Sequence, residues 1–127
     1  MTKQEVFTEV TEHLIKQGAM SVRLINGKEQ GAYYGMEGLR CAVGCLIEDH
    51  MYNEAIEGKS LCTPEVKEAL GEIADDEDIL YLLTDLQEIH DNTPVNLWPQ
   101  RFTDIANEYG LDMGRGLLYI NECWDQF

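Results

Sequence analysis

The stretch DDEDILYLLTDLQEIHDN, residues 75–92, decides the fold expected of this chain, because its apolar residues recur at helical spacing. Carboxylates at residues 75–78 come first, where they interact favourably with the dipole and the unpaired amides of a helix N-terminus. The apolar stripe that follows ends in a histidine and consists of Ile79, Leu82, Leu83, Leu86, Ile89 and His90. The stretch therefore predicts an amphipathic helix with one buried face.

Capping and stop signals delimit three further helices. Thr2–Glu5 has the spacing of a capping box, and Gly18 is a C-terminal stop. Thr63-Pro64 reads as an N-cap followed by proline in the first helical position, and Gly110 ends a third apolar pattern. We expect these helices over residues 3–17, from Pro64 to near Leu70, and from about Trp98 to Tyr109.

A β-hairpin is predicted between the first two helices. Asn26-Gly27 is the strongest short-range hairpin signal, and the apolar residues of Val22–Ile25 lead into it. We expect Ala32–Tyr34 to form the returning strand. The apolar stretch 117–124 is left without an assigned type. The expected fold is α+β: a mainly α-helical single domain over residues 1–127 with one small β-hairpin.

A segment dense in small and apolar residues, GLRCAVGCLI, occupies residues 38–47. We expect a buried helix over Leu39–Ile47, which places Cys41 and Cys45 on one helix face because they are four residues apart. That spacing fits a packed thiol pair, two metal ligands or a reactive thiol. A zinc site would need completion by Cys62, His50 or His90, but no second tight cysteine pair is present, so we predict no metal and no cofactor.

Buried, reduced, structural thiols are the favoured interpretation of Cys41 and Cys45. In a thiol enzyme, Cys41 would be the nucleophile, His90 the base and Asp91 its orienting carboxylate. Against this, His90 continues an apolar stripe, where a hydrogen-bonded core histidine is commoner than a catalytic one. A small-ligand pocket is a further alternative, and its expected lining is Tyr33, Cys41, Tyr52 and His90.

Composition narrows the possible classes of protein. The 127 residues include 44% hydrophobic residues, too many for a disordered chain, and carry a formal net charge of −15. Such a charge disfavours binding to bare nucleic acid or to an anionic membrane. The chain opens into an amphipathic pattern instead of a signal peptide and has no apolar run of membrane-spanning length. We therefore expect a cytoplasmic protein with reduced cysteines and no membrane partner.

The charge is unevenly distributed along the chain. Residues 1–59 contain nine acidic and six basic residues, whereas residues 60–127 contain fifteen acidic and three basic ones. Rows of carboxylates can imitate the phosphates of DNA to a basic protein surface. A solvated face that only keeps the protein soluble is the simpler explanation of the same pattern. The carboxylates expected to contact a partner are Asp75, Asp76, Glu77, Asp78, Asp85 and Glu88.

The segment 38–47, followed by Tyr52 and Glu57-Gly58-Lys59-Ser60, resembles a family of small uncharacterised proteins from bacteriophages and bacterial genomes. The stretches LQEIHD at 86–91 and IANEYGL at 105–111, with Trp98, resemble the same family. The resemblance implies a phage-related setting and assigns no catalytic residue. Together with the charge, it leads us to expect a non-enzymatic acidic inhibitor or modulator of a basic, nucleic-acid-handling host protein. The alternative is a small-molecule-binding protein or thiol-dependent enzyme centred on Cys41, Cys45 and His90.

Overall fold

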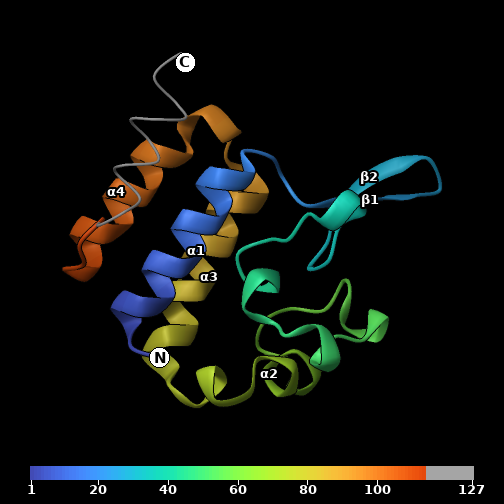
Figure 1. Ribbon diagram of the computed structural model, residues 1–127, viewed down its shortest axis with the longest axis horizontal. Helices are drawn as coiled ribbons and strands as arrows, with labels where there is room; N and C mark the ends of the chain where they lie inside the picture. The colour runs from blue at the N-terminus through green and yellow to red at the C-terminus, as the bar shows by residue number, and fades with distance from the viewer. Residues whose placement is uncertain (114–127) are drawn as a thin grey trace.

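Three long helices pack against one another in the computed structural model, which describes residues 1–113 (Figure 1). They are α1 (Lys3–Gln17), α3 (Glu77–Asn92) and α4 (Trp98–Tyr109). A shorter helix, α2 (Pro64–Leu70), lies near the N-terminus of α3, and a 3₁₀ turn over Gly71–Asp75 connects the two. The expectation of a mainly helical α+β fold is confirmed, and the four helices fall where the capping and stop signals predict them.

Side-chain caps explain where α1 and α3 begin. The Thr2 hydroxyl accepts a hydrogen bond from the Glu5 N–H at 3.1 Å, and the Glu5 carboxylate accepts one from the Thr2 N–H at 2.9 Å. This backbone hydrogen bond lowers the pKa of Glu5. At α3, the Asp76 carboxylate accepts from the Asp78 N–H at 2.9 Å. Each cap satisfies amides that a helix N-terminus leaves unpaired.

The core lies between the facing apolar stripes of α1, α3 and α4. Trp98 opens α4 and is fully buried, and its indole N–H donates to the Thr93 carbonyl at 3.0 Å. The stripe predicted from residues 79–90 is buried throughout, and His90 with it. The largest core side chains are Phe7, Leu14, Ile15, Ile79, Leu82, Leu83, Leu86, Trp98 and Phe102.

The hairpin consists of β1 (Val22–Ile25) and β2 (Lys28–Gly31), paired antiparallel. Asn26 and Gly27 both have positive φ, 54° and 79°, as a two-residue type I′ turn requires. The prediction that Ala32–Tyr34 form the returning strand is wrong, because the two-residue turn sets a register that pairs Ile25 with Lys28 and Val22 with Gly31, so the strand lies at residues 28–31. Ala32–Tyr34 instead turn inward and are buried. Figure 1 shows the hairpin extending away from the helices.

The predicted helix over Leu39–Ile47 is also wrong. Its only helical part is a 3₁₀ turn over Gly44–Leu46, and Arg40 pairs with Tyr34 in an isolated β-bridge. Contacts with residues 33–34 account for the difference: the Cys41 N–H donates to the Tyr33 carbonyl at 3.4 Å, and the backbones are so close that a Cβ atom at Gly44 would lie 2.0 Å from that oxygen. The Tyr33 backbone thus packs directly on Gly44, and the apolar residues around it are buried in a turn instead of a helix.

Between β2 and α2 the chain forms short turns in place of regular structure. The 3₁₀ turns span Met36–Gly38, Gly44–Leu46, Asp49–Met51 and Glu54–Ile56. No helix within residues 1–113 is both long and apolar enough to cross a lipid bilayer. The apolar stretch 117–124 and Cys123 lie outside the described residues.

Candidate functional site

A cleft of about 510 Å³ opens between the end of β2, the last turns of α3, residues 57–61 and the cysteine segment, the name used below for residues 38–47. Tyr33 and Cys41, two of the four residues expected to line a pocket, do line it, whereas Tyr52 and His90 do not. Polar groups of α3 form the opposite wall, namely Thr84, Gln87, Glu88 and Asp91. The volume falls within the range typical of small-molecule sites.

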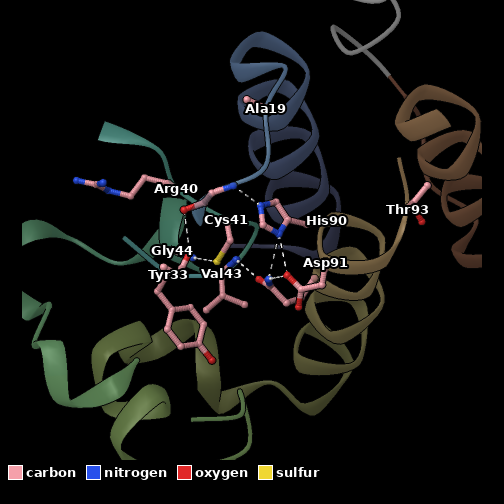
Figure 2. Close-up of polar contacts among 12 residues, drawn as sticks. Ala19, Tyr33, Arg40, Cys41, Val43, Gly44, His90, Asp91 and Thr93 are labelled. Carbon is pink, nitrogen blue, oxygen red and sulfur yellow. Dashed lines mark hydrogen bonds and ion pairs between the residues drawn. The ribbon is translucent and has the colours of Figure 1, made fainter. Parts of the chain in front are cut away.

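Cys41 is buried, with 1% of its surface exposed, and its sulfur accepts a hydrogen bond from the Gly44 N–H at 3.3 Å (Figure 2). Burial raises the pKa of this thiol to about 12. The Cys45 thiol donates to the Ala42 carbonyl at 3.1 Å, and burial raises its pKa as well. A thiolate is the reactive form of cysteine, so neither group is activated near neutral pH.

His90 uses both of its ring nitrogens in hydrogen bonds (Figure 2). The Ser21 N–H donates to Nε2 at 2.9 Å, so Nε2 must carry the lone pair. The proton is then on Nδ1, which donates to Oδ1 of Asp91 at 2.8 Å. Nε2 has no lone pair left for the proton of Cys41, and no hydrogen bond joins the two side chains in the described structure. Cys41, His90 and Asp91 lie in one region, but the arrangement favours a structural histidine over a catalytic base.

Gln87 is the residue of this region that the sequence interpretation missed. Its Oε1 accepts from the Val43 N–H at 3.1 Å, and its Nε2 donates to Oδ1 of Asp91 at 2.9 Å. Gln87 thus joins the cysteine segment to the end of α3. The signal that could have found it is the spacing of Gln87 and Asp91, four residues apart on a helix.

Tyr52 belongs to a separate stack of side chains. Its ring lies parallel to that of Tyr34, with centroids 3.9 Å apart. The Arg40 guanidinium carbon lies 3.6 Å from the centroid of the Tyr34 ring. The Tyr52 hydroxyl donates to Glu57 at 2.7 Å, and Glu57 also accepts from the N–H groups of Tyr33 and Tyr34. These contacts hold together a part of the chain with little regular structure.

The six carboxylates expected to contact a partner lie in two places. Residues 75–78 line a hollow of about 510 Å³ at the start of α3, together with Glu72 and Met1. Asp85 and Glu88 line a groove of about 440 Å³ between α3 and α4. Asp104 and Glu108, whose spacing also predicts an acidic row on the helix that follows, complete the acidic lining of this groove from α4.

Two of these carboxylates also serve the fold. Asp76 caps α3, and Asp85 accepts a hydrogen bond from the Tyr109 hydroxyl across the α3–α4 interface. Burial raises the pKa of Tyr109, and the carboxylates of Asp85, Glu108 and Asp78 add to the effect. Asp76 and Asp85 therefore contribute to stability whether or not a partner binds.

No group of three or more side chains suited to a metal ion occurs within residues 1–113, and Cys62 is exposed. No protein-family model matches the chain, and neither a curated protein nor a solved structure matches it significantly. The chemistry of the surface and of the cleft is therefore the basis for inferring a function.

Proposed function

We propose that this protein is a non-enzymatic binding protein whose acidic α3–α4 face occupies the basic surface of a nucleic-acid-handling partner. The groove between the two helices is the observation that supports the proposal. Carboxylates from both helices converge there, and Arg101 is the only basic residue that residues 1–113 contribute to its lining. We further propose that the protein is phage-encoded and acts as an inhibitor or modulator of a host protein.

The groove carboxylates are available to an external cation. Glu88, Asp104 and Glu108 are exposed, and no ion pair joins them to a basic side chain within residues 1–113. Asp78 and Asp85 are seven residues apart, so they extend the same acidic row along α3. An unpaired row of this kind attracts a basic surface over about 8 Å at physiological salt.

The test begins with tagged protein used to capture partners from a bacterial lysate at low and at high salt. A basic nucleic-acid-binding protein retained only at low salt is expected, because screening weakens contacts between exposed charges. Association rates with the captured partner are then measured for the wild type and for the double variant Asp104→Lys, Glu108→Lys. Both residues lie in the groove and outside the cleft described above.

The matched control is the double variant Glu29→Lys, Glu48→Lys, which makes the same change in net charge at exposed positions elsewhere. We expect the groove variant to associate about tenfold more slowly at low salt and the control to stay close to wild type. Equal slowing of both variants would show an effect of net charge alone. An association rate indifferent to salt and to both changes would contradict the proposal.

A second pair of substitutions, Asp75→Lys and Glu77→Lys, tests the other acidic group at the start of α3. Both side chains are exposed, and neither caps the helix. Asp76 and Asp85 are unsuitable for charge reversal, since their hydrogen bonds support α3 and the α3–α4 contact. Slower association of this pair would extend the interface to the N-terminus of α3, and an unchanged rate would confine it to the groove.

A further inference from the structure

Asp91 occupies an unfavourable position for a carboxylate. It lies in the last turn of α3, where the helix dipole is negative and basic side chains are preferred. Two donors nevertheless converge on its Oδ1, Nδ1–H of His90 at 2.8 Å and the Nε2 amide of Gln87 at 2.9 Å. A fully buried histidine thus orients a carboxylate at a position where the helix dipole disfavours negative charge.

The side chains of His90 and Gln87, which donate to Asp91, each accept a hydrogen bond from a backbone amide that fixes their orientation. The Ser21 N–H sets the tautomer of His90, and the Val43 N–H sets the orientation of the Gln87 amide. These amides come from two different segments, one leading into β1 and one following Cys41, and both contact the last turns of α3. The position of Asp91 is therefore determined before any ligand arrives, which lowers the entropic cost of binding.

The oriented carboxylate lines the 510 Å³ cleft, and 42% of its side chain is exposed. Its Oδ2 forms no hydrogen bond within residues 1–113, so it remains available to a donor. Among the described residues, Lys59 is the only basic one in the lining, and its ammonium nitrogen lies 3.6 Å from Glu65. Met20, Ala32, Tyr33 and Leu61 supply apolar and aromatic surface, and Glu57 adds a further carboxylate to the lining.

We propose that this cleft binds a small organic cation, an alkylammonium or alkylguanidinium, whose charged group pairs with Asp91 and whose alkyl part lies against Tyr33 and Leu61. A fixed carboxylate beside apolar and aromatic walls suits an elongated cation of this kind. Glu88, at the same mouth, adds a second negative charge. Glu88 also lines the α3–α4 groove, but Asp91 does not, so the proposed cation site stands independently of the proposed partner surface.

Butylguanidinium and its neutral isostere N-butylurea are matched probes for the proposal. Both are titrated into the ¹⁵N-labelled full chain at physiological salt, and amide chemical shifts are followed by NMR. We expect butylguanidinium to bind with a Kd of about 1 mM or tighter, a modest affinity for eight heavy atoms. The saturating shifts should lie at the cleft residues Gly31, Cys41 and Thr84, and N-butylurea should bind at least about tenfold more weakly.

Two substitutions distinguish binding in the cleft from non-specific attraction of a cation to the acidic protein. Asp91→Asn removes one charge with little change of shape and should weaken butylguanidinium binding at least about tenfold. Asp104→Asn removes one charge in the groove and should leave the affinity unchanged. Circular dichroism verifies folding, and Glu88→Gln, expected to weaken binding to a smaller degree, replaces Asp91→Asn if that variant does not fold.

Three results would overturn the proposal: equal binding of N-butylurea, absence of saturable shifts, and shifts centred on the α3–α4 groove that Asp104→Asn abolishes. None of them bears on the proposed partner surface, which is tested with Asp104 and Glu108 reversed. Loss of partner binding in that experiment would likewise leave the cleft intact. The two proposals can therefore fail independently.

Discussion

The backbone N–H of Ser21 donates to Nε2 of His90 at 2.9 Å, a contact that joins two positions 69 residues apart in the sequence. Ser21 leads into the hairpin, and His90 lies near the end of α3. The Ser21 hydroxyl donates to the Ala32 carbonyl at 2.8 Å on the far side of the hairpin. One buried histidine thereby attaches both strands of the hairpin to the helical core.

Replacing His90 should destabilise the protein. His90→Ala leaves the Ser21 N–H without an acceptor and opens a cavity beside Trp98, so we expect a loss of about 3 kcal/mol in the free energy of unfolding. Urea denaturation followed by circular dichroism measures it. His50→Ala is the control, because His50 is exposed and should change stability by less than about 0.5 kcal/mol. Equal stability of the two variants would contradict the role of His90.

Gly44 should tolerate no side chain. A Cβ atom there would lie 2.0 Å from the Tyr33 carbonyl oxygen, and backbone atoms cannot yield as a flexible side chain can. We expect Gly44→Ala to cost more than about 4 kcal/mol or to prevent folding. Gly58→Ala is the control: it has open space but a φ of 79°, so its cost should be about 1 kcal/mol. Thermal unfolding distinguishes the two outcomes.

The three described cysteines should react with alkylating agents in the order of their exposure. Cys62 is exposed and should react first with iodoacetamide at pH 8, whereas Cys41 should react only after unfolding. The pKa of Cys41 is raised to about 12 by burial, so its thiolate fraction at pH 8 is small. Timed alkylation with peptide mass spectrometry gives the order. Rapid labelling of Cys41 in the folded protein would reopen the thiol-enzyme alternative.

Stability should fall in alkaline solution. The ordinary pKa of a thiol is near 9, and burial raises that of Cys41 to about 12. Between these values the unfolded chain releases its proton and the folded protein keeps it, so unfolding becomes more favourable as pH rises. One such group contributes a slope of about 1.4 kcal/mol per pH unit. Urea titrations between pH 8 and 10.5 should show this fall, and Cys41→Ser should make it shallower.

The helices were predictable because their signals are local. The capping box at Thr2–Glu5, the proline at Pro64 and the apolar stripe of α3 each lie within the element that they specify. The turn at Asn26-Gly27 was predictable for the same reason. The second strand was misplaced because Ala32–Tyr34 have strand-like composition, whereas the register is set by the turn and by burial against distant residues.

The cysteine segment and the cleft depended on contacts remote in sequence. A short apolar run has the same composition in a buried helix and in a buried turn, and the Tyr33 backbone against Gly44 decides between them. The sequence placed His90 on the buried stripe, but its tautomer depends on Ser21. The acidic rows on α3 and α4 were predictable from residue spacing, whereas their convergence in one groove depends on the packing of the two helices.

Hydrogen bonds fix the length of the chain in the turns between β2 and α2. The Tyr34 hydroxyl donates to the Ile47 carbonyl, the Tyr33 hydroxyl to the Lys59 carbonyl, and Glu57 accepts from both tyrosine amides. Each hydrogen bond forms only when the number of residues between its donor and its acceptor stays the same. Insertions or deletions between Tyr33 and Lys59 would therefore disrupt several contacts at once, whereas the exposed hairpin tip could lengthen freely. Natural variation in chain length should concentrate at the tip.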